Sequence, residues 1–162
     1  MSSESLSFFI SSKPIDHVAI LYKKGNLLDK ILSREKTIES RWYNSKYPPW
    51  NRIKTDDVIY LKDSGGLVRG KVTVERVLQY NLTQEKSEEL FHQYGKKICL
   101  NEPDISKWLA WTKSKKYCIL LFLKDPQTIK PFQTDKTGFG NACAWMIVGD
   151  INKVRKINKD KN

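Results

Sequence analysis

The sequence predicts an α+β fold, in which a mixed β-sheet is flanked by short helices. Several runs are rich in β-branched and aromatic residues and are bounded by Gly, Pro, Asn or Asp. Two later segments combine helix-capping residues with apolar residues at helical spacing. The chain has 162 residues, of which 40% are hydrophobic, so we expect a single domain over residues 1–162 with one core.

The first half of the chain is expected to supply strands around one short helix. Residues 17–22 are β-rich and predict the first strand, and apolar residues at helical spacing in 27–32 predict a helix of about two turns. Two more strands are predicted over 57–62 and 67–78, joined by a hairpin turn with two glycines. Gly70, inside the second of these strands, indicates a bulge or a close approach of another segment.

The second half of the chain begins with two helices. Thr83 is placed as the N-cap of a helix that should run to Tyr94 and end at Gly95. A second helix is expected over residues 104–112, after Pro103. Together these helices should cover one flank of the sheet.

The last part of the chain returns to β structure. The most apolar run, 117–123, predicts a central strand, which Asp125 and Pro126 should stop. A long loop is expected over 130–141, followed by a final strand over 142–148 with Trp145 inside. We expect an ordered core of about residues 15–154 and a basic tail, 155–162, that frays.

The charge balance favours a polyanionic partner. The chain has 29 Lys and Arg against 18 Asp and Glu, a formal net charge of +11 and a pI near 9.5. Nucleic acid is the commonest partner of such a surface, and we expect RNA or another single-stranded nucleic acid. The alternative is that the charge serves only solubility or reflects a lysine-rich composition.

Several kinds of site and location are not expected. The three cysteines form no Cys-x-x-Cys pair and the two histidines have no ligand spacing, so neither a metal site nor a cofactor is predicted. Three widely spaced cysteines predict reduced thiols, and there is no apolar run of membrane-spanning length and no signal-peptide pattern. We therefore expect a cytoplasmic protein without membrane contact. The sequence does not indicate an oligomeric state.

A charged segment, Lys36-Thr37-Ile38-Glu39-Ser40-Arg41-Trp42, is the main candidate site. On a strand, Glu39 and Arg41 share one face, and Lys36 joins them only if the strand twists or is entered through a bend. Two cations and one anion would then form a cradle for a polar, partly anionic ligand such as a nucleotide. The alternative is a solvated strand edge with salt bridges worth under about 1 kcal/mol.

The order of these phrases resembles the ASCH family, a branch of the PUA-like β-barrel superfamily. Lys36-x-x-Glu39-x-Arg41 follows a short helix-like stretch and precedes a strand that opens with Asp56 and Asp57. The family has glycine where this chain has Arg34 and Asp56, both at turn positions. The resemblance covers about residues 15–154 and implies a small PUA-like mixed β-barrel. In such a barrel the short helix plugs one end and directs Lys36 at the pocket.

Three further segments are candidates for ligand contacts. The loop over 43–52 is rich in aromatic residues and cations, which suits stacking on unpaired bases, although its rings could instead fold inward as a lid. The turn at 63–66 could offer backbone amides to an anion or be a plain turn. The resemblance implies that the loop over 130–141 closes one side of the pocket. The candidate ligand-binding residues are Lys36, Glu39, Arg41, Trp42, Tyr47, Trp50, Ser64, Gly65, Gly66, Phe132 and Asn141.

Two functions of different class follow. The first is a nucleic-acid-binding module for RNA or a modified nucleotide, in which Glu39 accepts hydrogen bonds from an exocyclic amine. The second is an RNA-processing hydrolase, either a ribonuclease or a nucleoside amidohydrolase, with Lys36 as the catalytic base and Glu39 and Tyr60 as its partners. The resemblance implies a threonine nucleophile three residues after the motif lysine in the amidohydrolase branch, but that position is Glu39 here. A protein-interaction module is a third possibility.

Overall fold

The computed structural model describes residues 13–100, 104–140 and 143–157. Its main feature is one six-stranded sheet with strand order β2-β5-β4-β3-β1-β6. Strands β1 and β3 are parallel and the other neighbours are antiparallel. The strands are β1 (Asp16–Leu21), β2 (Ile38–Tyr43), β3 (Val58–Asp63), β4 (Val68–Asn81), β5 (Tyr117–Phe132) and β6 (Trp145–Gly149). The helices are α2 (Leu27–Leu32), α3 (Gln84–Ile98), α4 (Ile105–Thr112) and the 3-10 helix η1 (Ile151–Lys153).

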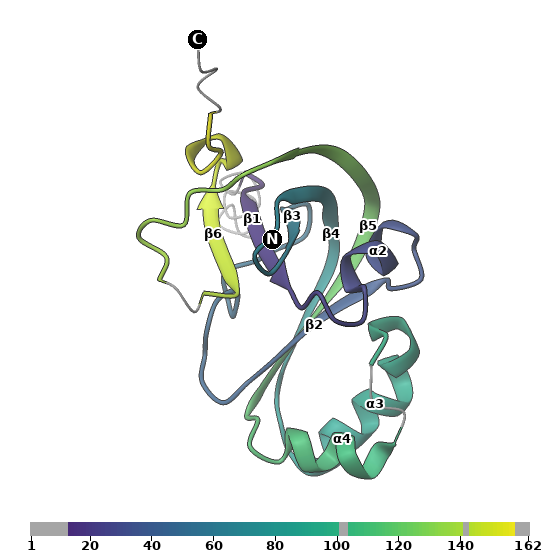
Figure 1. The fold of residues 1–162 in the computed structure, drawn as a ribbon. Helices are drawn as coiled ribbons and strands as arrows, with labels where there is room; N and C mark the ends of the chain where they lie inside the picture. The colour runs from purple at the N-terminus through teal and green to yellow at the C-terminus, as the bar shows by residue number, and fades with distance from the viewer. Residues whose placement is uncertain (1–12, 101–103, 141–142, 158–162) are drawn as a thin grey trace, which may run out of the picture.

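The sheet curls into a half-barrel, with α2 beside it and with α3 and α4 together against the part formed by β2, the end of β4 and the start of β5 (Figure 1). The predicted α+β fold with a mixed sheet is therefore confirmed. The edges of the sheet are β2 and β6, so a seam remains between them. Within the described residues, no helix is long and apolar enough to cross a membrane.

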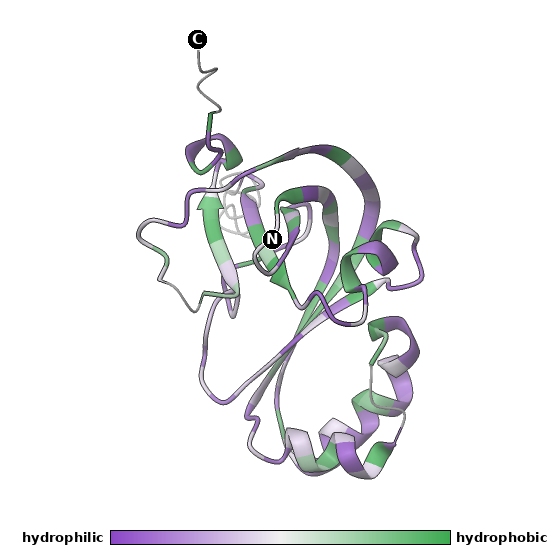
Figure 2. Cartoon of the chain, viewed as in Figure 1, coloured by the Kyte–Doolittle hydropathy of each residue, from purple (hydrophilic) through white to green (hydrophobic). Residues whose placement is uncertain are grey.

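Both faces of β5 are buried near its start, at residues 118–121, which explains the long apolar run that predicted a central strand. Ile119 and Leu121 point into the half-barrel, whereas Cys118 and Leu120 pack under α3 and α4. Strand residues alternate between the two faces of a sheet, so a strand covered on both sides is continuously apolar. Figure 2 shows hydrophobic residues along the strands and on the helices that face them. The expectation that the two helices cover one flank is confirmed.

Helix α3 begins as predicted but ends later than predicted. The hydroxyl of Thr83 accepts a hydrogen bond from the amide of Lys86 at 3.0 Å, which caps the N-terminus. The helix continues through Gly95 to Ile98 and ends at Cys99, whose φ of 57° is left-handed. The prediction that Gly95 ends the helix was wrong because burial of Ile98 outweighs the cost of about 1 kcal/mol of an interior glycine.

Strand β5 also runs further than predicted, through Pro126 to Phe132. Between Lys124 and Gln127 two residues lie opposite one residue of β4, which is the pattern of a β-bulge. The first residue of the bulge, Asp125, has a φ of 53°. The bulge removes Pro126 from the regular ladder, so its missing N–H breaks no pairing and the strand does not stop. Residues 130–132 consequently belong to the strand rather than to the loop.

Two turn positions keep a glycine-like backbone without glycine. Arg34 has a φ of 67° and Asp56 a φ of 74°, and these are the positions at which the resembling family carries glycine. Gly70, inside β4, shows both the bulge and the close approach of another segment that its place in a strand indicated. The register of β4 shifts beside it, and a side chain there would bring its Cβ within 3.0 Å of Leu32 in α2.

The beginning of the basic tail is ordered. Arg155 forms an isolated β-bridge with Thr134, and its guanidinium lies 4.1 Å from the centroid of the Phe132 ring. The amide of Lys156 donates to the carbonyl of Gln133. Ring and backbone contacts therefore hold Arg155 and Lys156, the first residues of the expected tail, against the chain before β6. Residues 158–162 lie outside the described part of the chain.

Candidate functional site

A pocket of about 580 Å³ opens beside the seam between β2 and the β1–β6 edge. It is lined by β2, the end of β1, the segment after α3, the end of α4 and residues of the loop before β6. Lys36, Glu39 and Arg41 all line this pocket. Lys36 lies two residues before β2 and directly after a bend of the chain at Glu35, which fits the condition set for bringing the three side chains together.

Lys36 is buried, with 3% of its surface exposed. Its ammonium donates to the carbonyl of Ile38 at 2.8 Å and to the carbonyl of Ile98 at the end of α3. Burial lowers the pKa of Lys36, although the nearby carboxylate of Glu39 acts in the opposite direction. An ammonium has three donors, so one remains after these two bonds.

Arg41 holds the seam together rather than facing solvent as a free cation. Its guanidinium donates to the carbonyls of Ile20 and Ala144, both at 3.3 Å, and lies 5.1 Å from the centroid of the Trp145 ring. Its Nε is 3.5 Å from one carboxylate oxygen of Glu39. These contacts join β2 to β1 and to the chain beside β6.

Glu39 carries the most informative atom of the pocket. Its side chain is 7% exposed, and one carboxylate oxygen, Oε1, faces Arg41. The other oxygen, Oε2, is buried and accepts no hydrogen bond from any described residue. A buried carboxylate oxygen without a donor costs stability, so it is a ready acceptor for a ligand that brings an N–H or O–H group.

Aromatic side chains line the pocket, and two of them are exposed. Tyr22, at the end of β1, is 81% exposed, and Trp111, in α4, is 49% exposed. Lys115 lies 4.9 Å from the centroid of the Trp111 ring. Tyr43 also lines the pocket, and burial raises the pKa of its hydroxyl. Tyr43 belongs to the loop over 43–52 that was expected to offer rings for stacking. Tyr22, Trp111 and Lys115 were not predicted, because nothing in their local sequence shows that they meet at one opening.

The predicted aromatic candidates have other environments. Trp42 lines the pocket but is buried, with its ring 4.7 Å from that of Trp108. Trp50 packs against Tyr117 and the half-barrel core, so its ring folds inward rather than facing a ligand. Tyr47 is 53% exposed and lies outside the residues that line the pocket. The loop therefore divides its rings between the interior and the surface.

The predicted turn contributes only Ser64 to the pocket lining. The amide of Ser64 donates to the carbonyl of Leu21 and the amide of Gly66 to that of Asp63, so these two N–H groups are not free for an anion. Gly65 has the positive φ of 76° that the turn needs and is exposed. The alternative of a plain turn describes this segment better.

Three further predicted residues are not placed in the pocket. Phe132 and Tyr60 pack against each other at 6.2 Å, in the apolar cluster around β6 and η1. Tyr60 is therefore no partner of Lys36, contrary to the expectation, because β3 directs its ring to a different cluster. Asn141 lies outside the described residues. The loop before β6 still closes one side of the pocket, through Lys136 and Cys143.

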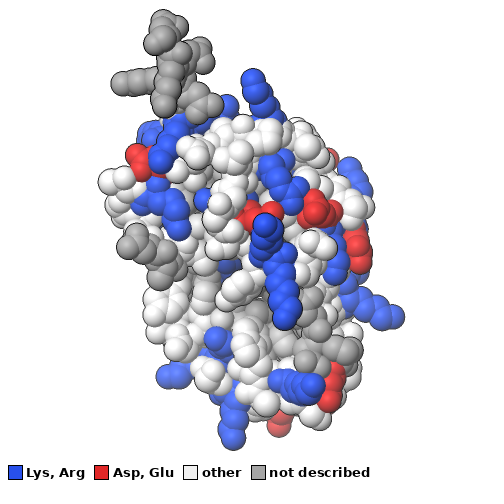
Figure 3. Space-filling model, viewed as in Figure 1, with Lys and Arg blue, Asp and Glu red and all other residues white. Residues whose placement is uncertain are grey.

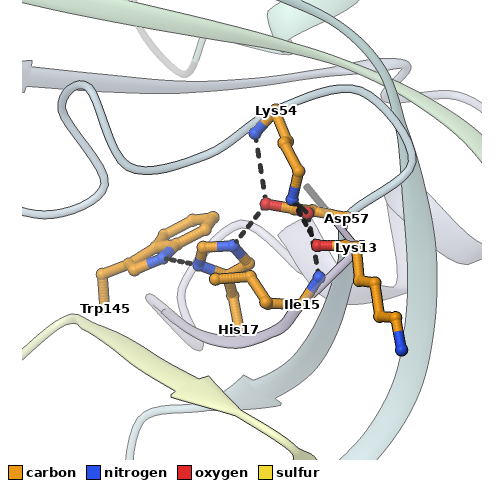
Figure 4. Close-up of polar contacts among 6 residues, drawn as sticks. All are labelled: Lys13, Ile15, His17, Lys54, Asp57 and Trp145. Atoms are coloured by element: carbon orange, nitrogen blue, oxygen red, sulfur yellow. Dashed lines mark hydrogen bonds and ion pairs between the residues drawn. The ribbon is translucent and has the colours of Figure 1, made fainter. Parts of the chain in front are cut away.

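Behind Arg41 lies a buried polar network that the sequence did not reveal (Figure 4). The indole N–H of Trp145 donates to Nδ1 of His17 at 3.0 Å, so Nε2 of this ring carries the proton and donates to Asp57 at 2.9 Å. Burial alone would raise the pKa of Asp57, but hydrogen bonds from His17 and Lys54 and from the amides of Ile15 and Lys54 lower it to about 2. The network fixes the Trp145 ring on which Arg41 rests.

No metal-ligand cluster is seen in the described ranges, where no three His, Cys, Asp or Glu side chains lie together in a suitable arrangement. The described lining of the pocket combines the carboxylate of Glu39 with four cationic side chains, those of Lys36, Arg41, Lys115 and Lys136, and with aromatic rings.

Comparison with known proteins identifies the architecture. No protein-family model matches the sequence, and no curated protein sequence matches it significantly. Among solved structures, ASCH from Zymomonas mobilis is similar, with 18% identity and a TM-score of 0.61 over 82% of this chain and 87% of that one. The chain has the ASCH fold. A point mutant of the same Zymomonas protein gives a TM-score of 0.61 and 18% identity over 82% of this chain and 89% of that one. At this identity the ASCH likeness concerns the fold.

Proposed function

We propose that this ASCH-fold protein is an RNA-binding module whose pocket holds one unpaired nucleotide. The observation that carries the proposal is Oε2 of Glu39, a buried carboxylate oxygen with no donor among the described residues, in the wall of a pocket of about 580 Å³. Pockets for small ligands have volumes of roughly 300–1,000 Å³ and place a few polar groups among apolar ones.

The groups around Glu39 suit a nucleotide. The carboxylate accepts a hydrogen bond from the exocyclic amine of a base, and the remaining donor of Lys36 is available to a base edge or phosphate. The exposed faces of Tyr22 and Trp111 at the opening offer surfaces for stacking. Recognition of RNA commonly combines these two contacts, stacking of an unpaired base and hydrogen bonding to its edge.

The net charge of +11 supports a polyanionic ligand. Lys and Arg side chains are spread over the half-barrel and the helices in Figure 3, and acidic side chains are few on that face. Binding that depends on such cations weakens as salt rises, because each neutralised phosphate releases counterions. We therefore expect RNA affinity to fall steeply with ionic strength.

The test is a Glu39→Gln variant, which keeps the size of the side chain but replaces part of the acceptor with a donor. We expect the wild type to bind CMP, AMP or GMP, which carry an exocyclic amine, more tightly than UMP, and we expect Glu39→Gln to lose this preference. NMR titration detects such weak binding. Glu75→Gln, an exposed position on β4, is the matched control. Equal affinity of the wild type for UMP and the amine-bearing nucleotides would contradict the proposal.

A second candidate function is hydrolysis at the same pocket, favoured by the lowered pKa of Lys36. A base must be neutral to accept a proton, and burial moves this amine in that direction, whereas its two carbonyl acceptors favour the charged form. Incubation with N4-acetylcytidine and with single-stranded RNA, with and without Mn²⁺, tests this function. Product that disappears in Lys36→Met, with unchanged circular dichroism, would establish catalysis.

A further inference from the structure

A second and larger hollow, of about 790 Å³, lies on the other side of the segment that follows α3. It is formed by α2, by Glu35, and by the C-terminal half of α3 with the two residues that follow the helix. We call it the α3 hollow. Its lining includes Lys30, Glu35, Phe91, Lys96 and Lys97.

The α3 hollow and the candidate pocket share a wall. Cys99 and Leu100 line both. The residue before them, Ile98, provides the carbonyl that accepts from Lys36. A ligand that fills the candidate pocket and continues past this segment therefore enters the α3 hollow directly.

The charge of the α3 hollow complements a phosphate backbone. Three ammonium groups line it, those of Lys30, Lys96 and Lys97, against the single carboxylate of Glu35. No carboxylate of the described residues forms an ion pair with any of these three lysines. Lysines without carboxylate partners can neutralise phosphates without first breaking an ion pair.

The α3 hollow also offers a ring. Phe91 is half-buried and lines the hollow, with the ring of His92 edge-on to it at 5.6 Å. Cations along a groove together with an aromatic face are the combination that binds single strands without reading their sequence.

Building on the proposed function, we propose that the α3 hollow binds the nucleotide next to the one in the candidate pocket, and that the ligand is a single strand of RNA rather than a free nucleotide. A single strand is required because a base that enters the pocket must leave its stack. The candidate pocket then selects the base, and the α3 hollow adds affinity through the backbone.

The experiment compares a long and a short ligand on one double variant. Lys96→Glu/Lys97→Glu is titrated with a mixed-sequence RNA decamer by fluorescence anisotropy and with CMP by NMR. We expect at least tenfold weaker binding of the decamer at low salt, with unchanged CMP affinity. The slope of log affinity against log salt should shrink by about 1.4, since each phosphate contact on a single strand contributes about 0.7.

The matched control is Lys153→Glu/Lys156→Glu, which makes the same change of charge on two exposed residues in and just after η1. If this control weakens decamer binding as much as Lys96→Glu/Lys97→Glu, which we call the α3 variant, only general electrostatics is at work and the inference fails. It also fails if the α3 variant leaves decamer affinity unchanged or weakens CMP equally.

Failure of the proposed function gives a different pattern. If Glu39→Gln keeps the nucleotide preference and decamer affinity of the wild type while the α3 variant loses decamer binding, the α3 hollow stands and the base pocket does not. If the wild type binds no decamer, both are overturned.

Discussion

The guanidinium of Arg41 lies 5.1 Å from the centroid of the Trp145 ring. Arg41 belongs to one edge strand of the sheet and Trp145 to the other. The same guanidinium donates to the carbonyls of Ile20 and Ala144. Arg41, which was expected to form part of a cradle for the ligand, thus spans the two edges of the half-barrel and lines the pocket.

Replacing Arg41 with lysine should lower stability. A lysine keeps the charge but loses the planar fork that reaches two carbonyls and rests on the indole. Loss of these contacts at a side chain only 11% exposed predicts a decrease of about 1–3 kcal/mol in the free energy of unfolding. Urea denaturation measures it, with Arg52→Lys on the exposed loop as control. Equal stability of the two variants would show that the seam does not depend on Arg41.

Removing the exposed ring of Tyr22 should weaken RNA binding without unfolding the protein. The side chain is 81% exposed, so it contributes little to the core, and stacking on a base is worth about 1–3 kcal/mol. The comparison is Tyr47→Ala, an exposed tyrosine in the loop outside the pocket. Anisotropy titration with the RNA decamer separates them. A loss confined to Tyr47→Ala would assign stacking to the loop instead.

Stability should depend on pH through Asp57. Hydrogen bonds hold its pKa at about 2, below the ordinary 3.8, so the ionised form stabilises the fold. This contribution, about 2 kcal/mol, is complete above the ordinary pKa and disappears as the pH falls from about 4 toward 2. Urea denaturation between pH 5 and pH 2.5 should show a shallower slope for Asp57→Asn than for the wild type.

The matched control for this pH dependence is Asp56→Asn. Asp56 is exposed, and asparagine tolerates its positive φ. Its slope should match that of the wild type. If the free energy of unfolding of Asp57→Asn also depends on pH as steeply as that of the wild type, other carboxylates govern acid unfolding.

Two glycines should respond to alanine in opposite directions. Gly95 lies inside α3, where the nearest neighbour of a new Cβ is Leu100 at an ordinary 3.6 Å, so Gly95→Ala should stabilise by about 0.5–1 kcal/mol. At Gly70 the new Cβ would lie 3.0 Å from Leu32, and overpacking should destabilise by about 1–3 kcal/mol. Thermal unfolding measures both. If both substitutions change the stability in the same direction, the close packing of α2 against β4 at Gly70 is contradicted.

Local patterns were sufficient to predict most elements of the fold. Period-two alternation in β4, the cap at Thr83 and the apolar run of β5 each depend on neighbours in sequence. The errors fell where tertiary packing competes with a local signal. Burial of Ile98 carries α3 past a glycine, and a bulge carries β5 past Pro126.

The site was predictable only where its residues are close in sequence. Lys36, Glu39 and Arg41 were correctly expected to face one pocket if the chain bends before β2. Tyr22 and Trp111 come from distant elements and meet only in the folded chain. The contact of His17 with Trp145 spans 128 residues, which no local pattern can indicate.

The seam beside the pocket has a mechanical consequence. In the described strands, β2 pairs only with β5 and β6 only with β1, so no ladder of main-chain bonds spans the mouth. Widening of the seam would break the contacts that the side chain of Arg41 makes with Ile20, Ala144 and Trp145 and would leave every strand paired with its neighbour. A ligand that inserts between the two edges would therefore displace the side chain of Arg41 and would break no main-chain hydrogen bond of the sheet.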